Sequence, residues 1–243
     1  MQNLVERMGG TNTLYKRAYM LFALLGLMSV SASFILGFRF DPAAPAGNYL
    51  YDIELYVVFI AVHILMTMPA FKRVVYRDPA GTPAERRIYV AVSIITWLAV
   101  YWLHKPVPGF GLWAGPGWMV FLGLCGILLA LVAFFEFATI DRLCMLVAVP
   151  GYELSHTTGV ETPLMTEGSY SDVRHPMYRA FFYLAASSLI MHPNTGQLLF
   201  ALMVWLSFIV FIPFEERQLI KARGAQYLEY QQRVPYRVFR GIW

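Results

Sequence analysis

The feature that most constrains this chain is a series of long segments without a charged residue. Five of them occur in the 243-residue sequence: Ala18–Phe38, Leu55–Phe71, Ile88–Leu103, Pro106–Phe135 and Ala180–Phe214. A helix needs about 20 apolar residues to cross roughly 30 Å of hydrocarbon. Charged residues make up 14% of the sequence, against about 25% in a typical soluble domain. The sequence therefore predicts an all-α, polytopic membrane protein.

The two longest segments exceed one crossing, and each contains a turn signal. Pro106–Pro116 is rich in Gly and Pro and is predicted to be a loop, so the fourth helix is expected to cover Trp118–Ile140. His192-Pro193-Asn194 divides the other segment into a tight helical hairpin with the arms Met177–Met191 and Gln197–Phe214. We therefore expect about six transmembrane helices.

The chain divides by character into two regions, which we expect to form one integrated domain. Residues 1–140 hold four helices with short loops, and residues 141–243 hold a mixed segment, the hairpin and a charged tail. The tail starts at Glu215 and has helical periodicity, so it is expected to extend the sixth helix until Gly224 ends it. Because polar residues and motifs collect on one side of the membrane, chemistry is expected there.

Basic residues are sorted between the loops, and this predicts the orientation of the chain. Seventeen of the 19 Lys and Arg residues lie before the first helix, after the second and fourth helices, or in the tail, whereas the opposite loops hold Arg39 and Lys105. Cytoplasmic loops carry such an excess, so both termini are predicted to be cytoplasmic. The net charge of +4 is thus explained by membrane orientation, and no nucleic acid partner is expected. Short loops and a compact tail favour a bacterial inner membrane over a eukaryotic internal membrane.

The cysteine content predicts no disulfide and no metal site. The sequence has two cysteines, Cys125 inside a predicted helix and Cys144 just after it. Packing explains both residues better than a catalytic thiol does.

A dense group of polar residues precedes the hairpin. Residues 168–178 read Gly-Ser-Tyr-Ser-Asp-Val-Arg-His-Pro-Met-Tyr. Gly168 favours a turn, and Pro176 suits the first turn of a helix, so Arg174 and His175 are predicted to stand just before a helix N-terminus. Such a position suits an anionic group, for example a carboxylate. The alternative is that both side chains anchor lipid headgroups.

A pair of carboxylates, Glu215 and Glu216, lies where the sixth helix is expected to leave the bilayer. Carboxylates at a membrane boundary are costly unless they are solvated, paired or functional. The hairpin should bring this pair close to Arg174 and His175, with Tyr178 beside them. Both signs of charge in one small site suit a zwitterionic amino-acid group, with a ribose as a further candidate for the acidic residues. The alternative is a solvated helix end.

The order of these motifs resembles the isoprenylcysteine carboxyl methyltransferase superfamily, which includes phospholipid N-methyltransferases. The residues that carry it are the segment 168–178, the glutamate pair, and Gly224-Ala-Gln-Tyr-Leu-Glu-Tyr230 through Val234-Pro235. The resemblance implies that S-adenosylmethionine binds between the hairpin and the tail. The cofactor-binding residues that it implies are Gly168, Tyr170, Arg174, His175, Pro176, Tyr178, Glu215, Glu216, Tyr227 and Tyr230.

The N-terminal half is similar to one branch of that superfamily, nurim and the bacterial methanethiol S-methyltransferases. The similarity rests on residues 62–72, on residues 83–89, and on Trp102 with Pro106, and it extends the resemblance to about residues 55–237. It draws attention to His63, which is costly to bury in mid-helix unless it is hydrogen-bonded or faces a cavity. The alternative for His63 is a helix-to-helix hydrogen bond. Phe134–Arg142 departs from the pattern of the small-thiol enzymes and leaves the methyl acceptor open.

These features together predict a membrane methyltransferase that uses S-adenosylmethionine and S-methylates a small or lipophilic thiol. In-line transfer from a sulfonium is assisted mainly by alignment and desolvation. A thiol must also ionise, because the thiolate is the nucleophile. If His63 faces the cavity, it is expected to take the proton, with His156 and Arg142 as candidates on the cytoplasmic side. An apolar acceptor is expected to arrive laterally through the lipid bilayer.

Three other functions compete with this one. They are a carboxyl methyltransferase of the prenylcysteine type, whose acceptor needs no base, a non-catalytic nurim-like membrane scaffold, and a sterol-reductase-like enzyme that uses NADPH. A scaffold has no need of both signs of charge at the hairpin. The sequence has no Gly-x-Gly-x-x-Gly fingerprint, although membrane reductases need not use a Rossmann fold.

Overall fold

The uncharged segments fold as helices in the computed structural model, which describes residues 13–76, 83–112, 117–137 and 164–243. Within these ranges the chain forms helices and only isolated β-bridges. In chain order the elements are α2 (Thr13–Leu36), α3 (Gly47–Thr67), α4 (Pro69–Tyr76), α5 (Pro83–Leu103), α6 (Trp118–Phe137), the short 3₁₀ helix η1 (Gly168–Ser171), α8 (Pro176–Met191), α9 (Thr195–Arg223) and α10 (Ala225–Arg233). The prediction of an all-α membrane bundle is confirmed.

Helices occupy all six positions at which the sequence predicts a transmembrane helix, and four of them are long and apolar enough to span. These four are α2, α3, α5 and α9. In α6 the segment 118–132 is a shorter apolar helix. Helix α8 has 16 residues, because Pro176 begins it and the turn at 192–194 ends it. At 1.5 Å per residue it is about 24 Å long, short of the roughly 30 Å of hydrocarbon.

The helix in the second uncharged segment is displaced toward the N-terminus. Helix α3 begins at Gly47 and ends at Thr67, and Pro69 begins the separate helix α4. Proline has no N–H to continue the helical hydrogen bonds, which explains the break. The start was missed because absence of charge was the criterion, whereas Asp52 is fully buried in α3 and accepts a hydrogen bond of 3.0 Å from the backbone N of Lys105.

The predicted C-terminal hairpin is confirmed, and its ends have clear local causes. Pro176 stands in the first turn of α8. The side chain of Asn194 caps α9 by accepting a hydrogen bond of 3.0 Å from the backbone N of Gln197. Helix α9 continues past the bilayer segment to Arg223 and ends at Gly224, whose φ of +55° favours glycine.

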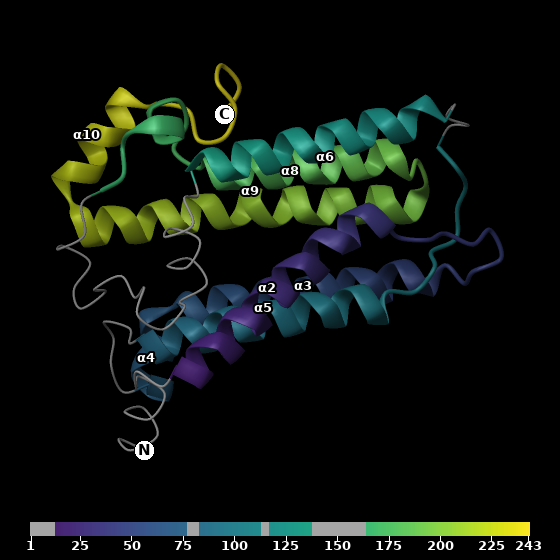
Figure 1. The fold of residues 1–243 in the computed structure, drawn as a ribbon, viewed down its shortest axis with the longest axis horizontal. Coiled ribbons are helices and arrows are strands. Elements are labelled where there is room, and N and C mark those ends of the chain that lie inside the picture. The colour runs from purple at the N-terminus through teal and green to yellow at the C-terminus, as the bar shows by residue number, and fades with distance from the viewer. Residues whose placement is uncertain (1–12, 77–82, 113–116, 138–163) are drawn as a thin grey trace.

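The helices form two layers that meet at one end (Figure 1). Helices α6, α8 and α9 lie side by side in one layer, α3 and α5 lie in the other, and α2 crosses between them. The layers join near the turn of the hairpin, where Gln197 accepts a hydrogen bond from the backbone N of Phe38 and donates one to Ser188. An aromatic core that includes Phe34 and Phe200 fills this junction.

The fourth predicted helix, α6, packs chiefly against α8 and therefore lies with the C-terminal hairpin. Two glycines make this close approach possible. A Cβ atom at Gly123 would meet the side chain of Met191, and one at Gly126 would meet that of Ser187.

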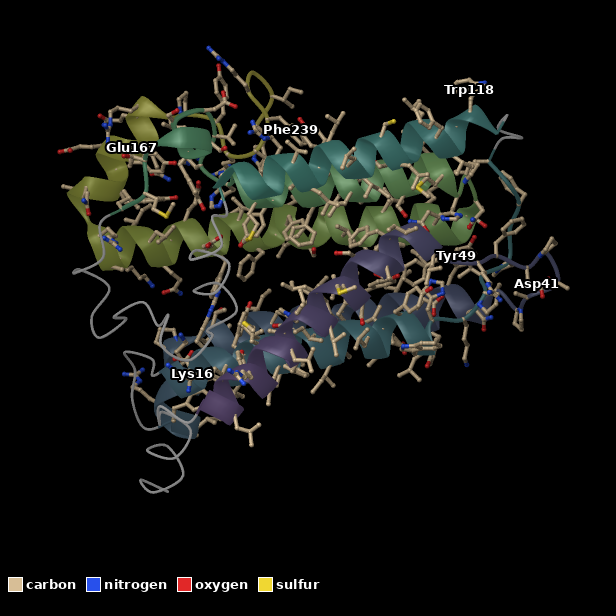
Figure 2. All side chains as sticks on the ribbon, in the orientation of Figure 1. Lys16, Asp41, Tyr49, Trp118, Glu167 and Phe239 are labelled. Carbon is tan, nitrogen blue, oxygen red and sulfur yellow. The ribbon has the colours of Figure 1, made fainter. Side chains whose placement is uncertain are left out.

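The end of the molecule away from the hairpin turn carries α10, η1 and the tail (Figure 1). Lys16 lies at this same end, whereas Asp41, Tyr49 and Trp118 lie at the other end (Figure 2). Phe239 of the tail sits beside α8, with its ring 5.4 Å from that of Phe182. The fold thus gathers the polar motifs of the sequence at one end of the bundle.

Candidate functional site

The hairpin brings the predicted charged residues into direct contact. Arg174 Nε donates to Glu216 Oε1 at 2.7 Å, and the two side chains are buried. His175 Nε2 lies 3.2 Å from the same oxygen. Tyr178 donates from its hydroxyl to Glu215 Oε2 at 2.8 Å. The proximity expected from the hairpin is therefore present in the structure.

Glu216 is engaged entirely by side chains of the protein. Its Oε1 accepts from Arg174 and faces His175, and its Oε2 accepts from Arg237 Nε at 2.9 Å. Its residue exposure is 3%. A buried carboxylate is tolerated when it is paired and hydrogen-bonded in this way. Glu216 thus joins the loop before α8, the end of α9 and the C-terminal tail.

Glu215 has different surroundings although it is the next residue. Its side chain is 36% exposed, and its Oε2 lies 3.5 Å from His175 Nδ1 as well as accepting from Tyr178. Successive residues on a helix point about 100° apart, which turns one glutamate into the protein and the other toward a cavity. Only Glu215 of the pair lines that cavity.

The loop before α8 is fixed to the tail through its backbone. The backbone N of Arg174 donates to Tyr236 O at 3.0 Å, and that of His175 donates to Arg237 O at 2.8 Å. Arg174 Nη1 also donates to Val234 O at 2.7 Å. The sequence suggested that Arg174, just before this helix N-terminus, suits an anionic group, and in the structure Arg174 pairs with the carboxylate of Glu216. Arg174 still lines the cavity.

Two tyrosines of α10 complete this end of the site. Tyr227 and Tyr230 are each 2% exposed, and Tyr230 donates to the backbone O of Tyr170 at 2.8 Å. Burial raises the pKa of Tyr230 to about 12. Burial also raises the pKa of Tyr227, with the nearby Glu216 carboxylate adding to the effect. Both phenols therefore remain protonated hydrogen-bond donors at neutral pH.

These groups surround a cavity of about 190 Å³. The described residues that line it are Leu164, Met165, Tyr170, Arg174, His175, Met177, Tyr178, Glu215, Leu219, Tyr227 and Tyr230. Seven of the ten residues implied as cofactor-binding are among them. Gly168, Pro176 and Glu216 are not, and they shape the cavity instead: Gly168 has a φ of +61° at the start of η1, and Pro176 begins α8.

Four apolar lining residues were missed by the sequence reasoning: Leu164, Met165, Met177 and Leu219. One of them carried a usable signal. Leu219 follows Glu215 by four residues, so both lie on the same face of α9. The cavity thus combines a carboxylate, an arginine and phenols with an apolar wall. This combination suits a zwitterionic amino-acid group that continues into a less polar portion.

Of the three candidates for proton transfer, only His63 is among the residues that the structure describes, so only His63 can be compared with this cavity. His63 does not line it. Its Nδ1 lies 2.9 Å from the Phe59 carbonyl O of its own helix, and its ring packs against Phe59 and, at a centroid distance of 5.8 Å, against Tyr89. In the described part of the chain, the hydrogen bond of the His63 side chain is thus within α3 and does not reach a neighbouring helix. Arg142 and His156 lie outside the described residues.

Comparison with known proteins gives consistent matches. The model of the isoprenylcysteine carboxyl methyltransferase (ICMT) family matches residues 128–221. The chain is 31% identical to methanethiol S-methyltransferase 2 of Bradyrhizobium diazoefficiens, over 92% of this chain and 90% of that protein. It is 28% identical to the methanethiol S-methyltransferase of Pseudomonas deceptionensis, over 76% of this chain and 70% of that protein.

A third relative matches a shorter part of the chain. Protein-S-isoprenylcysteine O-methyltransferase B of Arabidopsis thaliana is 42% identical over 73 residues, which cover 30% of this chain and 37% of that protein. No solved structure matches the chain.

Proposed function

Because the chain belongs to the isoprenylcysteine carboxyl methyltransferase family, we propose that this membrane methyltransferase transfers a methyl group from S-adenosylmethionine to a small or lipophilic thiol. The observation that carries the proposal is the cavity that the partly exposed Glu215 lines together with Arg174 and several phenols. The relatives that match along most of the chain bear the name methanethiol S-methyltransferase, whereas the isoprenylcysteine enzymes match about 30% of it.

The residues around the cavity fit the amino-acid end of this cofactor. An ammonium group needs an acceptor, and Glu215 offers a carboxylate whose protein contacts leave it partly exposed. A carboxylate group needs positive potential and donors, which Arg174 and the neutral phenol of Tyr227 supply. Glu216 is a positioning residue, because its own bonds hold Arg174 in place.

When bound, S-adenosylmethionine supplies an electrophilic methyl group on a sulfonium. The chain contributes alignment and exclusion of water. Met177 and Leu219 form an apolar wall of the cavity. The backbone hydrogen bonds between the loop at Arg174 and the tail keep the polar wall of the cavity in place. Tyr178 holds Glu215 in position through its hydroxyl.

His63 is the proposed base for a thiol acceptor. A carbonyl oxygen only accepts hydrogen bonds, so His63 Nδ1 carries the hydrogen that it donates to Phe59 O. In the neutral ring, Nε2 then has a free lone pair and can take the proton of a thiol. A carboxylate acceptor needs no such base, which favours a thiol. Arg142 and His156 remain the other candidates for this step.

The site is proposed to face the cytoplasm of a bacterial cell, with both termini on that side of the inner membrane. The support is that 17 of the 19 basic residues lie before the first predicted helix, after the second and fourth predicted helices, or in the tail. S-adenosylmethionine is then expected to enter from the cytoplasm and the acceptor from the bilayer.

Calorimetry with the purified, detergent-solubilised protein tests the proposal. S-adenosylmethionine and its demethylated product, S-adenosylhomocysteine, are expected to bind at one site per chain, and NADPH is expected not to bind. Absence of binding by both sulfur compounds would reject the cofactor assignment. Binding of NADPH alone would support the reductase alternative.

A further inference from the structure

A groove between α3 and α5 lies apart from the proposed cofactor cavity. Its volume is about 310 Å³, within the range of about 300–1,000 Å³ that is usual for ligand pockets. The residues that line it come from 51–59 of α3 and 96–103 of α5, and none of them lines the cavity beside Glu215. The groove therefore lies toward the end of the bundle at which Tyr49 is labelled, away from α10 (Figures 1 and 2).

Small side chains on α5 leave the space for this groove. Thr96 and Ala99 are three residues apart, so they lie on one face of the helix, and both line the groove. Val100 forms its floor and is 4% exposed, whereas Val58 and Leu103 form its rim and are 61% and 53% exposed. The groove is therefore mainly apolar and opens outward, toward the hydrocarbon that surrounds the bundle.

One acidic and one basic residue stand at the same end of this groove. Glu54 lines it and is exposed, and among the described residues its carboxylate has no hydrogen-bond or ion-pair partner. Lys105 follows α5, and its Nζ lies 4.1 Å from the centroid of the Tyr51 ring, which also lines the groove. The backbone N of Lys105 donates to Asp52 Oδ1 at 3.0 Å and fixes this loop beside the first turns of α3. An apolar groove thus ends in groups of both signs of charge.

This end of the groove lies near the surface of the membrane. Helix α5 ends at Leu103, and Trp102 is 78% exposed, as is typical of tryptophans in the interfacial belt. Glu54 is seven residues after Gly47, the first residue of α3, which is about 10 Å along the helix. A carboxylate so near to hydrocarbon is costly unless it is solvated or paired. A ligand that brings a cation to Glu54 relieves that cost.

We propose that the groove binds one phospholipid with a primary ammonium headgroup, whose ammonium group donates to the Glu54 carboxylate and whose phosphate pairs with Lys105. One acyl chain of this lipid lies along Val58, Ala99 and Leu103. Charge complementarity selects this occupant: phosphatidylethanolamine has N–H donors for Glu54, phosphatidylcholine has none, and phosphatidylglycerol has no cation. The inference goes beyond the proposed function and does not depend on it, because the groove shares no lining residue with the cofactor cavity.

Native mass spectrometry of the full chain in detergent tests the inference, with three lipids of identical acyl chains titrated separately. The adduct with one phosphatidylethanolamine should form at about 10-fold lower lipid concentration than that with phosphatidylcholine or phosphatidylglycerol, the effect of one hydrogen bond between charged groups. Glu54→Gln removes the charge and keeps the size of an exposed side chain, so this preference should disappear. Asp41→Asn is the matched control and should keep the preference, because Asp41 is an exposed carboxylate at the same end that does not line the groove (Figure 2).

Ala99→Trp fills the groove and should weaken binding of all three lipids about 10-fold, the effect of losing the burial of about two CH₂ groups. Glu54→Gln decides the headgroup contact whether or not Ala99→Trp folds. Equal binding of the three lipids by the wild type, or a preference for phosphatidylethanolamine that survives in Glu54→Gln, would overturn the inference. A preference for phosphatidylglycerol would also overturn it, because Lys105 alone would then select the lipid. A lipid-free dimer that Ala99→Trp abolishes would show that a second copy of the chain covers the groove and would equally overturn the inference.

Discussion

Replacing Glu216 by glutamine should destabilise the end of the bundle that carries the site. Glu216 is 3% exposed and accepts hydrogen bonds from Arg174 and Arg237, with His175 facing it at 3.2 Å. The amide keeps the volume of the side chain but leaves the buried Arg174 without its counter-charge. Breaking a buried ion pair from one side costs about 3–5 kcal/mol. On the scale of soluble domains of this size, that lowers the melting temperature by roughly 6–20 °C.

Thermal unfolding of the purified protein in detergent, followed by far-ultraviolet circular dichroism, measures this effect. Glu215→Gln is the matched control, because it makes the same chemical change one residue earlier, at a side chain that is 36% exposed. Its melting temperature should lie within about 3 °C of the wild type, since a partly exposed pair contributes about 0–1 kcal/mol. A wild-type melting temperature for Glu216→Gln, or a larger loss for Glu215→Gln, would refute the division of roles between the two glutamates.

Three further predictions concern the same end of the molecule. Glu215→Gln should weaken binding of S-adenosylhomocysteine about 10- to 100-fold in calorimetry, because a charged hydrogen bond to the ligand is lost; unchanged affinity would remove Glu215 from the ligand. Gly224→Ala should lower the free energy of unfolding by about 1–3 kcal/mol, because φ +55° and ψ −127° strain any side chain while open space surrounds the position; a melting temperature equal to that of the wild type would contradict this. Burial raises the pKa of Tyr230 from 10.0 to about 12, so the stability that the neutral phenol contributes is complete below pH 10 and is lost as the pH rises toward 12. The melting temperature of the wild type should therefore fall between these pH values, and Tyr230→Phe should make this fall less steep. An equally steep fall in Tyr230→Phe would contradict the assignment.

The hairpin and its charged residues were predictable because their signals are local. Pro176, Asn194 and Gly224 each mark a helix end by their own backbone chemistry. Once the two arms are antiparallel, residues just before the first arm and at the end of the second must meet. The contacts of Arg174 with Glu216 and of Tyr178 with Glu215 follow from this topology.

The division between the two glutamates was not predictable. Neighbouring helical residues face different directions, but which of them faces the protein depends on the tail. Arg237 reaches Glu216 because the backbone N of His175 donates a hydrogen bond to Arg237 O. These two segments are about 60 residues apart and share no periodic pattern, so the sequence does not indicate that they meet. The packing of α6 on α8 was not predicted for a similar reason. Gly123 and Gly126 permit a close approach of another helix, but glycines in the sequence do not indicate which helix that is.

The bounds of α3 show a limit of hydropathy as a criterion. An uncharged segment marks the part of a helix that tolerates lipid, and a helix continues where a charge is buried against protein. Asp52 is such a charge, with Lys105 donating to it from its backbone and His104 Nε2 3.3 Å away.

The central claim is that this chain methylates a thiol at the cavity lined by Glu215 and Arg174. Transfer of label from S-[methyl-³H]adenosylmethionine to methanethiol by the purified protein tests it most directly. The account predicts labelled dimethyl sulfide in the volatile fraction, at a rate reduced at least 10-fold in Glu215→Gln. Label recovered as a base-labile methyl ester of a prenylcysteine substrate, with none in the volatile fraction, would contradict the thiol assignment, and no transfer to either acceptor would contradict the account as a whole.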